Sequence, residues 1–170
     1  MQGRPHRPIR IAVIGARQTS AHLAAAAEAI GREVARRGGV LLCGGMTGVM
    51  EAAARGAAAA GGTVVGILPT DTAEEGNPYL TIPLPTGMGE ARNVILVRSA
   101  EAIIAVGGAY GTLSEIGHAL NLGVPVIGLE TWNVSREGVT EPDPVRRAKD
   151  ALEAVEWAWE AAVERRRRSR

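Results

Sequence analysis

Short runs of aliphatic and β-branched residues alternate along this chain with longer, alanine-rich segments whose apolar residues recur at helical spacing. This alternation predicts parallel strands that are joined by right-handed helical crossovers. The predicted strands cover residues 9–14, 40–43, 63–67, 102–106 and 124–129. We therefore expect an α/β fold, a single Rossmann-like domain with an open, mostly parallel sheet and helices on both faces.

The helical segments are marked by apolar stripes that stop at glycine pairs or near proline. The first helix carries on one face Leu23, Ala26, Ala27, Ile30 and Val34. Further helices are predicted over residues 47–60 and 90–99 and from 112 to about 123. Residues 69–88, rich in Pro, Gly, Thr and Asn, predict a loop over the site with one short extended piece at 80–84.

A last helix is predicted after Pro144. Its apolar stripe comprises Ala148, Leu152, Val155, Trp159 and Ala162. Trp157 falls on the opposite side of this helix. An outward tryptophan indicates either a subunit contact or a solitary exposed aromatic residue.

The length of 170 residues suits one domain. We expect a flexible N-terminal segment over residues 1–8, the Rossmann-like domain over 9–164, and a basic, solvated tail over 165–170. The net charge of +1 predicts neither a nucleic-acid nor a membrane partner. With one cysteine, no signal-peptide pattern and no apolar run near the roughly 20 residues of a membrane span, we expect a cytoplasmic protein.

The segment from Val106 to Glu115 reads VGGAYGTLSE and carries the most informative pattern. An apolar run breaks into glycines and restarts as a helix-like pattern. Glycines allow a tight turn and close approach of the backbone to a ligand, and the first N–H groups of a helix attract anions. The segment therefore predicts a phosphate cradle.

Two further loops are expected beside this cradle. If the strand order is 3-2-1-4-5, the loops after the first, second and fourth strands converge where the order reverses, and open parallel sheets bind ligands there. We expect one phosphate site, or two, for a phosphorylated small molecule. The candidate binding residues are Gly15, Ala16, Arg17, Gly44, Gly45, Met46, Thr47, Gly107, Gly108, Tyr110, Gly111 and Thr112.

Several common sites do not match the sequence. The only lysine, Lys149, lies far from the glycine loops, so a Walker-type phosphate loop is absent. The dinucleotide-binding glycine fingerprint does not follow the first strand, and the second strand ends in Cys43 where such a protein would have an acidic residue. Cys43 is interpreted as a packing residue. No metal site is predicted, because the histidines stand singly at His6, His22 and His118.

Three side chains near the cradle have two interpretations each. Glu115 could hold ribose hydroxyls or assist a water that attacks an anomeric carbon, or it could complete a capping box with Thr112. Arg92 could orient a phosphorylated ligand or lie on a solvated helix face. Tyr110 could stack on a ring or pack against its own turn. Convergence of Glu115 and Arg92 on one pocket would favour chemistry.

The glycine pair Gly44-Gly45, the segment from Gly89 to Asn93 and the cradle together resemble the LONELY GUY superfamily, the "lysine decarboxylase-like" Rossmann proteins. Enzymes of that superfamily are phosphoribohydrolases, which release a free base and ribose 5-phosphate from a nucleoside 5′-monophosphate. The glycines, Thr112 and Glu115 match their signature P-G-G-x-G-T-x-x-E, and Val106 stands where its proline is expected, with one residue more between that position and Glu115 than the signature has. Their signature M-H-x-R-K retains only Arg92, because the other positions hold Gly89, Glu90 and Asn93.

Gly76-Asn77-Pro78-Tyr79 and Arg92-Asn93 are most similar to the branch of molybdenum cofactor carrier proteins. That branch binds a pterin with an anionic phosphate and performs no chemistry on it. The resemblance implies a carrier for a molybdenum cofactor-like pterin or a nucleotide, with no required cofactor and with a dimer or tetramer as the assembly. The alternative is a phosphoribohydrolase that uses Arg92 and Glu115. A module related to DNA-processing protein A is a third possibility, for which the sequence shows no basic face.

Overall fold

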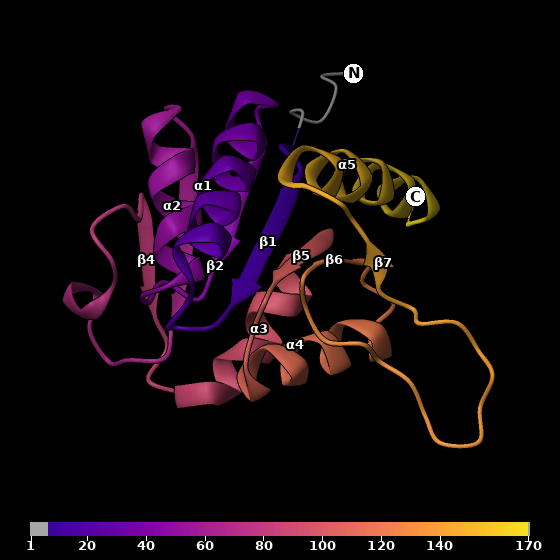
Figure 1. Cartoon of the computed structure of the whole chain (residues 1–170). Coiled ribbons are helices and arrows are strands. Elements are labelled where there is room, and N and C mark those ends of the chain that lie inside the picture. The colour runs from indigo at the N-terminus through magenta and orange to yellow at the C-terminus, as the bar shows by residue number, and fades with distance from the viewer. Residues whose placement is uncertain (1–6, 170) are drawn as a thin grey trace.

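Seven parallel strands form one open sheet in the order β4-β3-β2-β1-β5-β6-β7 (Figure 1). The computed structural model describes residues 7–169. The predicted strands and their 3-2-1-4-5 order are confirmed as β1 (Arg10–Gly15), β2 (Val40–Cys43), β3 (Thr63–Leu68), β5 (Ala102–Val106) and β6 (Val126–Leu129). Two short edge strands complete the sheet. The extended piece expected within the loop over 69–88 is β4 (Ile82–Pro85), and the sequence does not predict β7 (Arg146–Arg147).

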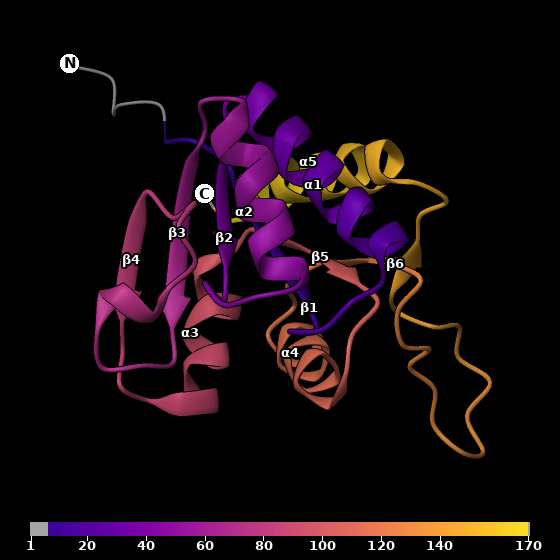
Figure 2. The same ribbon diagram turned by 60° about the vertical axis from the view of Figure 1, so that its left-hand side comes forward.

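Helices cover both faces of the sheet, as expected (Figures 1 and 2). One face packs against α1 (Ala21–Arg36), α2 (Val49–Ala59) and α5 (Ala151–Arg168). The other face packs against α3 (Arg92–Ser99) and α4 (Tyr110–Asn121). Alternate residues of each strand serve the two faces, because successive side chains point to opposite sides. No helix within residues 7–169 is long and apolar enough to cross a membrane.

The strand order reverses at β1 and β5, which lie side by side in the middle of the sheet. Their last residues, Gly15 and Val106, are register partners. The loops that follow these strands therefore start next to each other at the carboxyl edge, which is where this fold class binds ligands.

The last helix differs from its prediction. It begins at Ala151, where the Asp150 side chain accepts a hydrogen bond from the Glu153 N–H. Its buried residues include Val155 and Ala162 of the predicted stripe, together with Ala154 and Ala158, which lie outside that stripe. Leu152 is 62% exposed, whereas Trp157 is half-buried against the core. The Arg146 guanidinium lies 3.5 Å from the centroid of the Trp157 ring. The prediction of an outward Trp157 is therefore wrong.

The C-terminal arginines also differ from the expected solvated tail, because α5 continues to Arg168. Arg166 donates hydrogen bonds to both carboxylate oxygens of Glu101, at 2.7 and 2.6 Å, and to the backbone oxygens of Arg7 and Pro8. The start and the end of the described chain are thus joined to Glu101, the residue directly before β5. The flexible segment predicted over residues 1–8 falls mostly outside the described residues, as do His6 and Arg170.

Candidate functional site

A pocket of about 500 Å³ opens at the carboxyl edge of the sheet, beside the ends of β1 and β5. It is lined by the loop after β1, by the start of α3 with the 3₁₀ turn η2 (Gly89–Ala91) before it, and by the start of α4. Met50 of α2 and Pro69, directly after β3, complete the lining. The residues predicted from the sequence that line this pocket are Gly15, Ala16, Arg17, Arg92, Gly111, Thr112 and Glu115. The structure therefore brings the two candidate catalytic residues, Arg92 and Glu115, to one pocket.

Arg92 is the first residue of α3, and it is only 6% exposed. Its Nε and Nη1 atoms are buried without a hydrogen-bond partner among the described residues. Burial lowers the pKa of Arg92, and the nearby carboxylate of Glu115 partly offsets that effect. A buried cation with unmet N–H donors is costly, so this guanidinium is the strongest candidate in the pocket for contact with an anion.

Gly44 makes room for that guanidinium. A Cβ atom at Gly44 would lie 2.2 Å from the Nη1 atom of Arg92 and 2.6 Å from the sulfur of Met50. Gly44 at the end of β2 is therefore required for the position of Arg92, although Gly44 does not itself line the pocket. Its predicted role as a direct ligand contact is replaced by this indirect one.

Glu115 lies on the buried side of α4 and is 7% exposed. Burial raises the pKa of its carboxyl to about 7, and Arg92 acts in the opposite direction. No ion pair within 4.0 Å joins Glu115 to Arg92 in the part of the chain that the structure describes. Both groups are consequently available to a molecule in the pocket.

The capping-box interpretation of Thr112 and Glu115 is wrong. Helix α4 begins at Tyr110, two residues before the predicted start, and its N-cap is Ala109, which has no side-chain cap. Thr112 therefore lies inside the first turn, where it cannot act as the cap. Its place there depends on Gly108, whose φ is +119° and where a Cβ atom would lie 2.5 Å from the Cβ atom of Thr112.

Three helices, α1, α2 and α4, follow the loops that the sequence predicts as ligand-binding. Within the described residues, only the N-terminus of α4 among these three has no hydrogen-bond partner outside its own helix. At the start of α1 the side chain of Ser20 accepts a hydrogen bond from the N–H of Leu23. At the start of α2 the N–H of Val49 donates to the backbone oxygen of Ala16, at 3.1 Å. Gly111 and Thr112, in the first turn of α4, line the pocket, and the first N–H groups of a helix have no partner within that helix.

The remainder of the loop after β2 does not line the pocket. The Thr47 hydroxyl donates to the backbone oxygen of Arg17, at 3.1 Å, and the Met46 backbone oxygen accepts from the Asn77 amide, at 3.0 Å. A Cβ atom at Gly45 would meet Leu68 at 2.3 Å. Thr47 therefore contacts the loop after β1, whereas Met46 and Gly45 contact Asn77 and Leu68, and a second cradle at this loop stays a prediction.

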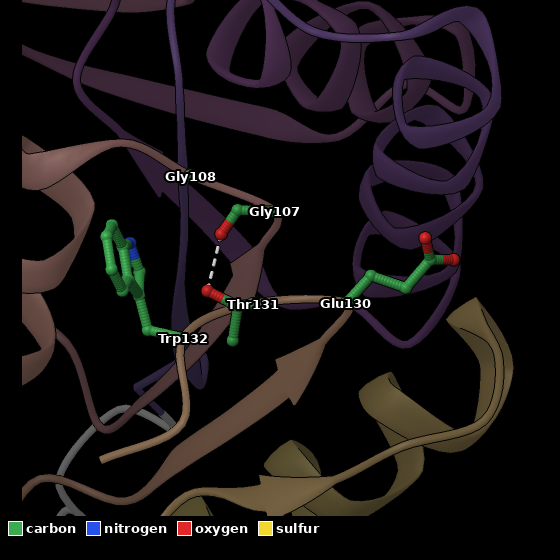
Figure 3. A pocket seen from close by; sticks show the side chains of 5 residues that line it. All are labelled: Gly107, Gly108, Glu130, Thr131 and Trp132. Carbon is green, nitrogen blue, oxygen red and sulfur yellow. Dashed lines mark hydrogen bonds between the residues drawn. The ribbon is translucent and has the colours of Figure 1, made fainter.

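Gly107 and Gly108 line a separate recess of about 250 Å³, together with Glu130, Thr131 and Trp132 (Figure 3). The Thr131 hydroxyl donates to the Gly107 backbone oxygen, and the Trp132 indole N–H donates to the Ala109 backbone oxygen, at 3.1 Å. Tyr110 is 79% exposed and its ring lies 5.5 Å from that of Trp132, centroid to centroid. The cradle loop thus separates two hollows.

Sequence reasoning missed several lining residues. In the large pocket these are Gln18, Met50, Pro69, Glu90, Asn93 and Ala109. In the recess they are Glu130, Thr131 and Trp132. The three recess residues follow β6 directly. This position could have indicated them, because the residues after a parallel strand lie at the carboxyl edge of the sheet.

The histidines, the acidic residues and Cys43 are the side chains of the described residues that metal binding or thiol chemistry would use. Within residues 7–169 no group of three His, Cys, Asp or Glu side chains could hold a metal ion. His22 lies 2.6 Å from a carboxylate oxygen of Glu130, and His118 is exposed on α4. Burial raises the pKa of the Cys43 thiol to about 11, which suits the packing role inferred from the sequence.

Residues 8–155 match the SLOG cluster4 family. The chain is 46% identical, over 122 residues, to an uncharacterized protein of Archaeoglobus fulgidus, and the match spans 72% of this chain and 80% of that protein.

Two solved structures resemble this one over most of their length. The molybdenum cofactor binding protein from the phototrophic bacterium Rippkaea orientalis superposes with a TM-score of 0.81 at 32% identity, covering 91% of this chain and 97% of that protein. The molybdenum cofactor carrier protein from Chlamydomonas reinhardtii superposes with a TM-score of 0.77 at 31% identity, covering 92% and 99%. These likenesses agree with the superfamily predicted from the glycine motifs, and the chain belongs to the SLOG cluster4 family.

Proposed function

We propose that this protein binds a small phosphorylated ligand in the pocket of about 500 Å³ and carries it without chemical change. The volume lies within the range that is usual for a site that holds one small molecule. Arg92 carries the proposal, because its buried guanidinium has N–H donors without a partner among residues 7–169. A phosphate would supply charge-assisted hydrogen bonds and offset the cost of burying this cation.

The uncapped start of α4 supplies the second half of the anion site. Gly111 and Thr112 line the same pocket as Arg92, and their backbone N–H groups stand at the positive end of the helix dipole. Arg17 adds an exposed cation at the rim. Glu115 opposes this field only in part, because burial raises the pKa of its carboxyl to about 7 and leaves it partly neutral at that pH.

We propose a molybdenum cofactor-type pterin as the ligand. Support comes from the two solved structures above, a molybdenum cofactor binding protein and a molybdenum cofactor carrier protein, each of which covers more than nine-tenths of this chain. A pterin with an anionic phosphate suits a site that combines a buried guanidinium with free helix N–H groups. The proposal includes a cytoplasmic homo-oligomer, a dimer or tetramer, as the resemblance implies.

Ligand retention tests the carrier role. The purified protein is incubated with molybdenum cofactor, and the retained pterin and the melting temperature are measured. At a ligand concentration one hundred times the Kd, binding adds about 2.7 kcal/mol to the free energy of unfolding, which raises the melting temperature by about 5–10 °C. Arg92→Met should lose this rise, whereas Arg98→Met on the exposed side of the same helix should keep it. A wild-type protein that retains no pterin would contradict the proposal.

A phosphoribohydrolase is the second candidate, and the convergence of Glu115 and Arg92 on one pocket favours it. In that reaction the Glu115 carboxylate would remove a proton from a water molecule that attacks the anomeric carbon. The N-glycosidic bond would break, and the base would leave with a proton while Arg92 held the phosphorylated sugar.

Release of free adenine from AMP separates the two candidates. The carrier proposal predicts no release above the rate in buffer alone. Release by the wild-type protein that disappears in both Glu115→Gln and Arg92→Met, but persists in Arg98→Met, would establish the hydrolase and overturn the carrier-only account. Release that is equal in all these variants would indicate a contaminating enzyme.

A further inference from the structure

The aromatic side chains of this protein are unevenly distributed around the cradle loop. The chain has no phenylalanine, two tyrosines and three tryptophans. Tyr79, Trp157, Trp159 and Trp132 are half-buried and pack against the core. Trp132 also forms a tilted pair with Tyr110, with ring planes 33° apart, and Tyr110 is 79% exposed. A half-buried indole that lines a hollow beside an exposed tyrosine is a surface on which a planar ring can stack.

The recess is held rigidly to the cradle loop. The Trp132 indole N–H donates to the Ala109 backbone oxygen, and the Thr131 hydroxyl donates to that of Gly107 (Figure 3). From the other side, Arg147 on β7 donates to the backbone oxygen of Thr131, at 3.2 Å. The indole is therefore already fixed beside the start of α4, so that a ligand would not have to order this wall when it binds.

Recess and pocket meet at consecutive residues of one loop. Gly107 and Gly108 line the recess, and Ala109 lines the pocket that contains Arg92. The two hollows thus adjoin along the chain at Gly108 and Ala109, and the side chain of Thr112, which lines the pocket, lies against Gly108. A molecule with a phosphate at one end and a ring at the other could therefore occupy both hollows.

We propose that the recess formed by Gly107, Gly108, Glu130, Thr131 and Trp132 is a second subsite, which binds a planar heterocyclic ring by stacking on Trp132 and Tyr110. This inference rests on the proposed function, because the phosphate of the same ligand occupies the Arg92 pocket. Figure 3 shows the Glu130 carboxylate directed away from the indole, and its partner is His22 of α1, at 2.6 Å. Recognition by stacking rather than by a carboxylate accepts purine and pterin rings alike.

Two probes separate ring binding from phosphate binding. Isothermal titration calorimetry is performed with GMP, which has a phosphate and a ring, and with ribose 5-phosphate, which has no ring. The wild-type protein should bind GMP more tightly than ribose 5-phosphate. Trp132→Ala and Tyr110→Ala should each weaken GMP binding about tenfold and leave the affinity for ribose 5-phosphate unchanged.

Trp132→Phe is the matched control. It removes the indole N–H that bonds to Ala109 but keeps an aromatic face. The proposal predicts GMP affinity near that of the wild type in this variant. If Trp132→Phe is as weak as Trp132→Ala, the indole acts through its hydrogen bond, and stacking is overturned.

The remaining outcomes distinguish this inference from the proposed function. If both alanine variants bind GMP as tightly as the wild type does, the ring subsite is overturned, while phosphate binding that depends on Arg92 still stands. Equal loss of GMP and ribose 5-phosphate affinity in Trp132→Ala would also overturn the ring subsite, because it would show damage to the cradle. If the wild type binds neither probe, the proposed function and this inference both fail.

Discussion

The buried carboxyl of Glu115 makes the stability of the free protein depend on pH. Burial raises the pKa of Glu115 from 4.5 to about 7, in spite of Arg92. Between these two pH values the folded state binds more protons than the unfolded state, so the free energy of unfolding falls as the pH rises. At about 1.4 kcal/mol for each pH unit, the contribution is about 3 kcal/mol. It is fully present below about pH 4.5, decreases as the pH rises from 4.5 to about 7, and is absent at higher pH.

The comparison of wild type with Glu115→Gln isolates this contribution, since glutamine does not titrate and the other groups cancel. Urea unfolding of both proteins is followed by circular dichroism from pH 4.5 to pH 8. We predict that the stability of the wild type relative to Glu115→Gln falls by about 3 kcal/mol over this range. A difference that is constant, or that rises with pH, would refute the reasoning that burial dominates over attraction to Arg92.

Two further substitutions test neighbouring parts of the structure. Gly44→Ala places a Cβ atom 2.2 Å from the Nη1 atom of Arg92, so we predict at least tenfold weaker binding of ribose 5-phosphate by calorimetry. Gly117→Ala is the control, because Gly117 is exposed on α4 and a Cβ atom there would have no described atom within 4 Å beyond its own helix turn. This variant should keep the affinity for ribose 5-phosphate unchanged. Equal affinity in the two variants would show that Gly44 does not position Arg92. Glu101→Gln should destabilise the fold by about 2 kcal/mol at pH 7, because it weakens charge-assisted hydrogen bonds from Arg166. Burial opposes ionisation of Glu101, but the hydrogen bonds from Arg166 and Arg10 outweigh it and lower the pKa, so the advantage of the wild type is present above about pH 4.5 and should disappear as the pH falls. Urea unfolding at pH 7 and pH 3 measures it, and an equal difference at both pH values would argue against an ionised Glu101.

The central strands and their order were predictable because buried parallel strands read as short apolar runs between helical stripes. The face by which the last helix packs was predictable only in part. Its buried residues are the small side chains Ala154, Val155, Ala158 and Ala162, while the larger Leu152 is exposed. In an alanine-rich helix the apolar stripe is a weak signal, and the face that packs is decided by long-range contacts with α1, β5 and β6.

The candidate site was predictable only in part. Strand order alone placed the loops after β1 and β5 together, because the register pairs Gly15 with Val106. Spacing could not decide whether Glu115 caps its helix, since the answer depended on where α4 begins. Residue spacing also could not show that the Arg92 guanidinium is buried without a hydrogen-bond partner among the described residues. That burial results from the close approach of Arg92 to Gly44. The recess at Trp132 arises from hydrogen bonds between two loops that are distant in sequence.

Affinity for ribose 5-phosphate in the wild type, Arg92→Met and Arg98→Met tests the central claim most directly, because it isolates the phosphate and the buried guanidinium. Methionine fills similar space without a charge, so Arg92→Met should unfold at a temperature equal to or above that of the wild type. The account predicts that calorimetry detects binding to the wild type and to Arg98→Met, and a loss of at least tenfold in Arg92→Met. Unchanged affinity in a folded Arg92→Met protein would contradict it.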